Sequence, residues 1–142
     1  IGDFGIARDS ASQGLQTMGG GIIGTLGYLA PERLVPPEGP TTSADWFPSD
    51  QYAVGVTAFE ILSGGTHPFR MDHDDGHPVH EASGVTHRAL RIPELGRPTP
   101  ATERALLRMM APQLADRFRD VHRAHDSLNL AYTVDGIPLP WR

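Results

Sequence analysis

The segment from Ser49 to Ser63 constrains the fold of this chain more than any other stretch. It is apolar on nearly every face of a helix, and its apolar residues are Tyr52, Ala53, Val54, Val56, Ala58, Phe59, Ile61 and Leu62. A helix of this kind belongs in the interior of a domain. Ser49 is expected to cap its beginning, and Gly64 and Gly65 are expected to end it. We therefore predict a central helix over about 49–63.

Two further helices are predicted over about 99–132. The first should open with Thr99 as its cap and with Pro100 in its first turn, where a missing backbone N–H is harmless. The second should begin near Phe118, and its apolar stripe is predicted to be Val121, Leu128 and Tyr132. The sequence shows no strand longer than a stub, so the chain is predicted to be mainly α.

Composition and charge narrow the class of protein. A chain of 142 residues with 39% hydrophobic and 20% charged residues suits one globular domain. No run reaches about 18 apolar residues, so we expect no membrane segment here, although a longer parent could carry an anchor. The net charge of -5 argues against a nucleic-acid partner. The absence of Cys excludes disulfides and Cys-ligated zinc and fits a reducing compartment such as the cytoplasm.

Four short motifs follow one another along the chain. They are "DFG" at 3–5, "GTLGYLAPE" at 24–32, "SDQYAVG" at 49–55 and "DRF" at 116–118. In this order and at these separations they resemble the C-terminal half of a eukaryotic-type protein kinase domain, of the kind found in bacterial Ser/Thr kinases. The resemblance implies a partial kinase domain over 1–132, helical like the C-terminal lobe and without the N-terminal lobe and catalytic loop. Residues 133–142 would form a tail.

The first motif carries the metal chemistry that the resemblance implies. ATP crowds negative charge around the transferring phosphate, so a kinase needs Mg²⁺, which prefers hard oxygen ligands such as carboxylates. By resemblance Asp3 is that ligand, Phe4 packs to orient it, and Gly5 lets the backbone swing. ATP and Mg²⁺ are therefore the implied cofactors, proteins are the implied substrates, and residues 3–32 form the activation segment.

Two threonines of that segment have implied roles. Thr25 matches the position whose hydroxyl helps to hold the catalytic Asp in kinases that phosphorylate Ser and Thr. Thr17, in "LQT", resembles the activation-loop threonine of bacterial kinases, and it is the predicted regulatory phosphosite. A phosphate there could pair with Arg and order the loop. Ser10 and Ser12 are interpreted as residues of a solvated polar loop.

Four residues are implied to hold the domain together. Glu32 ends "APE" and should make a buried two-point contact with Arg117, far downstream. Asp50 should bind the backbone of the catalytic loop, although the dipole of a helix also favours an acid in its first turn. Gly55 should allow another element to pack closely against the central helix.

The chain lacks the other parts of a working kinase. All 12 of its Lys and Arg residues are Arg, so the ATP-binding Lys is absent, and its one Asn is Asn129. The stretch "HRAHDSLN" at 122–129 echoes a catalytic loop, but Ala124 stands where Asp is required. We therefore expect a piece of a longer kinase that is inactive by itself. The alternative is a degenerate remnant that acts as a non-catalytic binding module.

Two other classes of function come from different features. The polar stretch over 70–86 contains groups that can bind Zn²⁺ or Ni²⁺, namely Asp72, His73, Asp74, Asp75, His77 and His80. Gly76 and Pro78 break any helix that could aim these groups at one ion, which favours a surface insertion without metal. A plain helical interaction module is the other class, and it predicts no dependence on Mg²⁺ or ATP.

Overall fold

The computed structural model describes residues 26–33, 47–69 and 87–138. Within these ranges the chain is helical, and its extended segments form only the isolated bridges Phe69–His87 and Arg91–Pro98. The mainly α fold predicted from the sequence is confirmed. The elements in chain order are the 3₁₀ helices η1 (Leu26–Tyr28) and η2 (Pro31–Arg33), the helices α1 (Phe47–Ser63) and α2 (Pro100–Met109), the 3₁₀ helix η4 (Leu114–Asp116) and the helix α3 (Val121–Val134).

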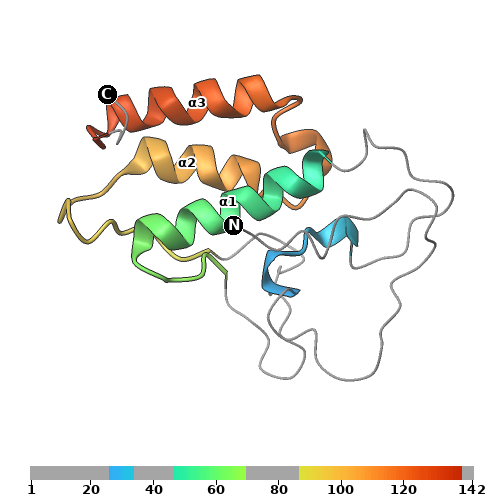
Figure 1. Ribbon diagram of the computed structural model, residues 1–142, viewed down its shortest axis with the longest axis horizontal. Coiled ribbons are helices and arrows are strands. Elements are labelled where there is room, and N and C mark those ends of the chain that lie inside the picture. Colours follow the sequence, from blue (N-terminus) through green and yellow to red (C-terminus); the bar gives the residue numbers. More distant parts are fainter. Residues whose placement is uncertain (1–25, 34–46, 70–86, 139–142) are drawn as a thin grey trace, which may run out of the picture.

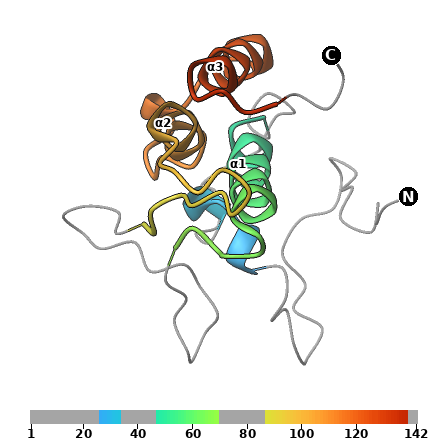
Figure 2. The same cartoon turned by 90° about the vertical axis from the view of Figure 1, so that its left-hand side faces the viewer.

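The three long helices lie side by side, and α2 contacts both α1 and α3 (Figure 1). The chain direction, from blue to red, shows that α2 runs antiparallel to the other two. Figure 2 views the helices nearly end-on and shows them as a three-cornered bundle, with η1 and η2 below α1. None of the helices in the described ranges combines the length and the apolar character that crossing a bilayer requires.

Helix α1 is the central helix predicted from the sequence, but it begins two residues earlier, at Phe47. Ser49 is therefore not its cap, but a buried residue inside its first turn. The Ser49 hydroxyl binds groups that are more distant in the sequence and are described below. Gly64 and Gly65 end the helix as expected, with φ angles of 74° and 98° that favour glycine. The side chains of Val54 and Ile61 are 55% and 74% exposed, so the described residues leave part of this apolar helix uncovered.

Gly55 of α1 lies directly against the C-terminal end of α2. A Cβ atom added there would stand 2.7 Å from Cγ of Met110 and 3.1 Å from Cβ of Met109. Real Cβ atoms essentially never come within 3.0 Å of another atom, so the absence of a side chain at Gly55 is what permits the approach of Met110. The geometry agrees with the close packing expected at this glycine.

Helix α2 starts with Pro100 in its first turn, as predicted, but Thr99 caps it only by position. The Thr99 hydroxyl is buried and has no hydrogen-bond partner among the described residues. Instead the carboxylate of Asp135 accepts the backbone N–H groups of Ala101 and Thr102, at 3.4 and 2.6 Å. The cap therefore comes from the residue that follows α3, and a local sequence pattern cannot show it.

Helix α3 begins at Val121, three residues after the predicted start, because Asp120 caps it by accepting the backbone N–H of Arg123 at 2.8 Å. The predicted apolar stripe is wrong at Val121, which is 57% exposed. The buried face is built on Ala124 and Ala131, with Leu128 packed against the core. Helix α3 also continues two residues past Tyr132, to Val134.

The core lies between the helices and the segment that joins α1 to α2. Tyr52 of α1 stacks against Phe69, with ring centroids 6.1 Å apart. Both side chains are fully buried, and each such aromatic ring removes a large apolar area from water. The buried apolar residues of this core are Ala30, Tyr52, Val56, Phe59, Phe69, Leu90, Ile92, Leu106, Met109, Met110, Phe118 and Ala124.

Candidate functional site

The predicted site residues divide into two groups. Glu32, Asp50, Gly55 and Arg117 are described by the structure. Five predicted site residues lie outside the described residues: Asp3, Phe4, Gly5, Thr17 and Thr25. The His-rich stretch over 70–86 also lies outside them. The site that the structure describes is therefore the group around Glu32, at the end of the "GTLGYLAPE" motif.

Arg117 and Glu32 form the two-point contact expected from the sequence. The guanidinium donates from Nη1 to Oε1 at 2.8 Å and from Nη2 to Oε2 at 2.9 Å, across 85 positions of sequence. The Arg117 side chain is 0% exposed and that of Glu32 is 22% exposed. Paired parallel hydrogen bonds of this kind are the strongest contact that these two side chains can make.

The rest of the Arg117 guanidinium is also engaged. Its Nη1 donates to the backbone oxygen of Pro48 at 2.8 Å, and its Nε donates to that of Ala111 at 2.7 Å. The guanidinium carbon lies 5.2 Å from the centre of the Tyr52 ring. Arg117 therefore joins three segments: the end of "APE", the start of α1 and the loop after α2. A buried charge is tolerated because its hydrogen bonds replace the lost water.

Ser49 extends this cluster on the other side of the carboxylate. Its hydroxyl donates to Oε1 of Glu32 at 2.8 Å and accepts a hydrogen bond from Nε of Arg33 at 2.7 Å. Burial pushes the pKa of Glu32 upward, but hydrogen bonds from Arg117, its own backbone and Ser49, with the Arg117 charge, hold that pKa below its ordinary value. The carboxylate is thus kept ionised. Sequence reasoning missed the role of Ser49, because a serine at a helix start suggests a cap.

Gln51 is a second residue that sequence reasoning missed. Its side-chain amide donates from Nε2 to the Phe118 oxygen at 3.1 Å, and its Oε1 accepts the Phe118 N–H at 3.0 Å. Both groups are buried, so the pair fixes the backbone immediately after Arg117. One signal was available in the sequence: a glutamine inside an otherwise apolar helix needs a partner.

Gly27 and Tyr28, the last two residues of "GTLGY", are anchored to α1 and to the loop that follows it. The Tyr28 hydroxyl donates to Oε2 of Glu60 at 2.5 Å, and this bond, with partial burial and the Glu60 charge, raises the pKa of Tyr28. Nδ1 of His67 lies 3.2 Å from both the Phe69 N–H and the Phe69 oxygen, and its Nε2 lies 3.1 Å from the Gly27 oxygen, to which it donates in the tautomer that carries the proton there. Two polar contacts therefore hold this short stretch.

Asp50 lies in the first turn of α1 with its side chain exposed. That turn carries the positive end of the helix dipole, which is sufficient reason for an acid there. The catalytic-loop partner that the resemblance gives to Asp50 is not part of this chain. Among the described residues, no group of three or more His, Asp or Glu side chains could hold a metal ion. The described site thus fixes a loop against a helical scaffold.

The chain matches known protein kinases over most of its length. It is 33% identical over 118 residues to the probable serine/threonine-protein kinase PBL11 of Arabidopsis thaliana, which is 83% of this chain and 25% of that protein. It is 31% identical over 130 residues to the serine/threonine-protein kinase PknD of Mycobacterium tuberculosis, 89% of this chain and 18% of that protein. It is 38% identical over 72 residues to the human serine/threonine-protein kinase/endoribonuclease IRE2, 49% of this chain and 7% of that protein.

These relatives are far longer than the chain, which spans a quarter of their length or less. They come from a plant, a bacterium and a mammal, so they do not single out the bacterial kinases. No protein-family model and no solved structure matches the chain. The helical fold and the ordered motifs agree with the kinase relatives. The chain is therefore a segment of a eukaryotic-type protein kinase domain, its C-terminal half from the DFG motif onward.

Proposed function

We propose that this chain is the C-terminal part of a Ser/Thr protein kinase that transfers the γ-phosphate of ATP to Ser and Thr residues of proteins. The observation that carries the proposal is the buried contact between Glu32 and Arg117. Two charged residues 85 positions apart rarely become buried partners by accident, since burying each alone would be costly. Here they join two of the motifs on which the kinase resemblance rests.

The contact has a mechanical role in the proposal. A kinase depends on the position of its activation segment, and the far end of that segment is fixed here to α1 and to the loop after α2. The Tyr28–Glu60 bond fixes a point four residues earlier. The segment is therefore held at its end, by Tyr28 and Glu32.

Asp3 is proposed as the ligand of Mg²⁺ on ATP, with Phe4 and Gly5 controlling its orientation. The donor chemistry fits, because a carboxylate is the hard oxygen ligand that Mg²⁺ prefers. When bound, Mg²⁺ would neutralise charge on the phosphates. Asp50 is proposed to bind the catalytic-loop backbone of the complete domain, in a cytoplasmic protein. The partial domain is proposed to cover 1–132.

The activity assay uses the chain and its parent in parallel. The purified chain should incorporate no phosphate with Mg²⁺-ATP, because its sequence has no Lys and no catalytic-loop Asp and Asn. In the complete parent, Asp3→Asn should abolish phosphate transfer to a protein substrate, whereas the control Glu94→Gln, on an exposed turn, should leave it unchanged. An inactive parent would favour the non-catalytic remnant, and activity in the Asp3→Asn variant would refute the assigned role.

Two further measurements on the complete kinase test which residues it phosphorylates and how it is regulated. Phosphoamino-acid analysis should find phosphate on Ser and Thr, and Thr25→Ala should lower the rate. Mass spectrometry should find phosphate on Thr17, and Thr17→Ala should lower activity because an added phosphate can pair with Arg and order the loop. Full activity without phosphate at Thr17 would remove that assignment and leave the kinase proposal intact.

A further inference from the structure

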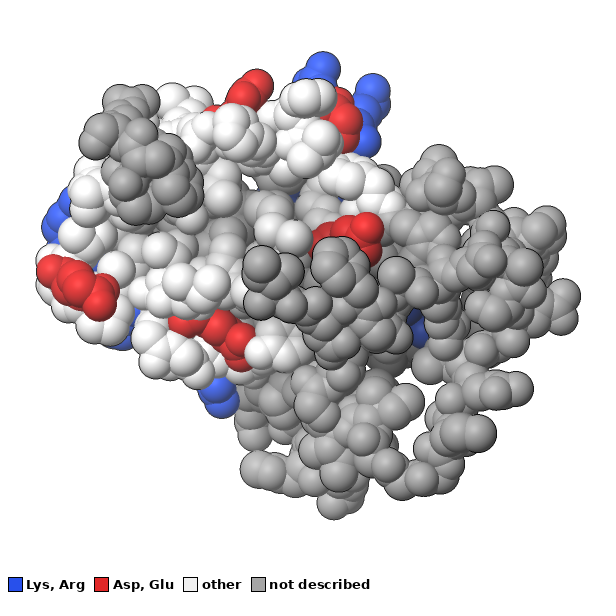
Figure 3. All heavy atoms as spheres, in the orientation of Figure 1, with Lys and Arg blue, Asp and Glu red and all other residues white. Residues whose placement is uncertain are grey.

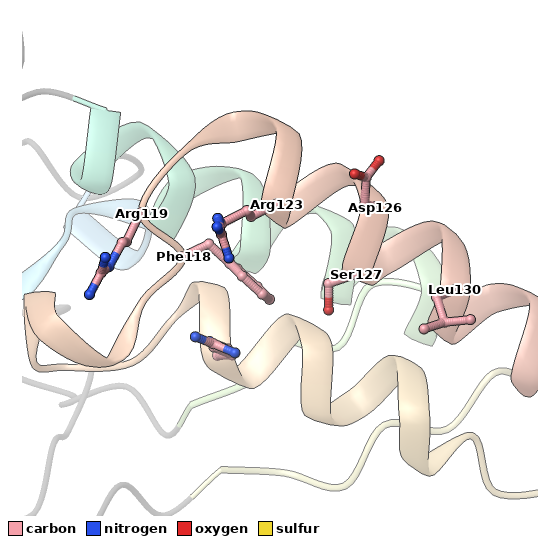
Figure 4. Close-up of a pocket in the computed structure, with 7 residues that line it drawn as sticks. Phe118, Arg119, Arg123, Asp126, Ser127 and Leu130 are labelled. Carbon is pink, nitrogen blue, oxygen red and sulfur yellow. The ribbon is translucent and has the colours of Figure 1, made fainter.

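A basic groove lies between α2 and α3, beside the segment that leads from η4 into α3 (Figure 4). Its volume is about 400 Å³. It is lined by Arg108, Phe118, Arg119, Arg123, Asp126, Ser127 and Leu130. It lies apart from the Glu32–Arg117 contact, although Phe118 directly follows Arg117 in the chain. The space-filling view in Figure 3 shows basic side chains projecting over the beginning of α3.

Three guanidinium groups gather at this groove in a chain whose net charge is -5. Arg108 stacks on the Phe118 ring, with its guanidinium carbon 4.4 Å from the ring centre. Figure 4 shows Arg123 directed toward the same ring, while the one carboxylate, Asp126, points away from it. The charge inside the groove is therefore positive, and an aromatic ring holds one of its cations in place.

The arginines of the groove are only partly used by the protein. Arg108 is exposed, and it donates from Nε to the Asp116 backbone oxygen at 3.3 Å. Arg123 pairs with Asp120 at 3.4 Å, and its side chain is 72% exposed, so solvent weakens that pair. Within the described part of the chain, Arg119 makes no hydrogen bond or ion pair. This groove thus has donors to offer that Arg117 does not have.

We propose that the groove binds a phosphorylated serine or threonine within an extended peptide segment. A carboxylate is matched by a single guanidinium fork, whereas a phosphate carries close to two charges and three acceptor oxygens and can use several forks. The Ser127 hydroxyl supplies a further donor, and Leu130, 66% exposed, gives an apolar contact for a neighbouring peptide side chain. Recognition here is separate from phosphate transfer, because it needs neither ATP nor the catalytic loop.

Binding is measured on the full 142-residue chain by fluorescence anisotropy. The probe is a labelled peptide with one phosphoserine flanked by leucines, compared with the same peptide carrying serine or aspartate. The phosphopeptide should bind at least about tenfold more tightly than either, and added salt should weaken it. The double variant Arg108→Gln/Arg123→Gln should lose at least about tenfold in affinity. The single variant Arg123→Gln, at an exposed position, should lose part of it and serves if the double variant does not fold.

The matched control is Arg91→Gln/Arg104→Gln, which removes the same charge at exposed positions outside the groove. It should leave the affinity for the phosphopeptide unchanged. Equal losses in both double variants would mean general charge attraction and would overturn the proposal. Equal binding of the aspartate peptide would overturn it too, because the groove would then accept any acidic segment, and so would absence of phosphopeptide binding. None of these outcomes bears on the kinase activity, which is measured separately.

Discussion

Arg117 and Arg123 lie close together in the sequence and occupy opposite environments. The Arg117 side chain is 0% exposed and is paired with a carboxylate and two backbone oxygens. The Arg123 side chain is 72% exposed, and its ion-pair partner Asp120, 3.4 Å away, is 48% exposed. The Arg117 guanidinium is buried and hydrogen-bonded within its own protein, so a ligand cannot reach it. Arg123 contributes little to the fold and is free to bind another molecule.

The difference shows that the surroundings of an arginine decide its role. Removing a partner from a buried pair leaves a charge that water cannot reach, whereas an exposed pair simply becomes hydrated. Gln51 connects the two regions, because its amide holds the Phe118 backbone next to Arg117 and thereby places the ring on which Arg108 stacks. Variants around Arg117 should therefore change mainly the free energy of unfolding, whereas variants around Arg123 should change mainly phosphopeptide binding.

The largest effect is expected for Glu32→Ala. It leaves the Arg117 guanidinium buried without its counter-charge, which should lower the free energy of unfolding by about 3–5 kcal/mol. Urea unfolding followed by circular dichroism measures it. The control is Glu94→Ala, at an exposed acid on a turn. Its free energy of unfolding should stay within about 0.5 kcal/mol of that of the unsubstituted 142-residue chain. Equal, small losses in the two variants would mean that the buried contact does not stabilise the fold.

Gln51→Ala should have the next largest effect and should reach both regions. It leaves the buried N–H and carbonyl of Phe118 without their side-chain partner, which should lower the free energy of unfolding by about 1–3 kcal/mol in total. Because Phe118 also supports Arg108, the variant should weaken phosphopeptide binding as well, measured by anisotropy. An unfolded variant would support only the stability part. A stable variant with unchanged binding would show that the two regions are independent.

Asp135→Ala tests a buried acid whose partners are backbone groups. Its carboxylate caps α2 in place of Thr99, so its removal should cost about 0.5–2 kcal/mol, as for other helix caps. Thermal unfolding measures the loss. The matched variant Thr99→Val removes a hydroxyl that has no described partner, and it should be neutral or slightly stabilising. A larger loss in Thr99→Val than in Asp135→Ala would contradict the assignment of the cap.

Low pH should weaken the Glu32–Arg117 contact. The fold holds the pKa of Glu32 below its ordinary value of 4.5, so the pair contributes its full stability above that value. The contribution falls as pH drops through the lower pKa of the folded state, because the carboxylate then takes up a proton. The difference in unfolding free energy between the parent chain and Glu32→Gln should therefore shrink below about pH 4.5. A constant difference down to acid denaturation would contradict this linkage.

The smallest effect on stability is expected for Arg123→Gln. Its pair with Asp120 is exposed, so the free energy of unfolding should change by less than about 0.5 kcal/mol. The same variant should weaken phosphopeptide binding. Arg123→Gln should therefore affect binding more than stability, whereas Glu32→Ala should affect mainly stability. A loss of stability comparable with that of Glu32→Ala would remove the distinction between the two regions.

The sequence alone was sufficient for features that rest on local patterns or on a family pattern. The central helix was predictable because its apolar residues recur at helical spacing and two glycines end it. Pro100 marked the beginning of α2 in the same way. The pairing of Glu32 with Arg117 was predictable only through the resemblance to kinases, since no local signal connects residues 85 positions apart. The roles of Asp3, Thr17 and Thr25 remain predictions.

Tertiary structure decided which polar group satisfies which. Ser49 was expected to cap a helix and instead binds Glu32, and Thr99 was displaced as a cap by Asp135. Phe118, predicted to begin the last helix, is instead held by Gln51 before α3 starts. The physical reason is common to all three: a buried donor or acceptor takes the nearest partner in space, and burial makes that choice worth more than the local preference. Sequence patterns describe residues that are close along the chain. The packing of three helices brings together residues that are far apart in the sequence, and no local pattern shows these contacts.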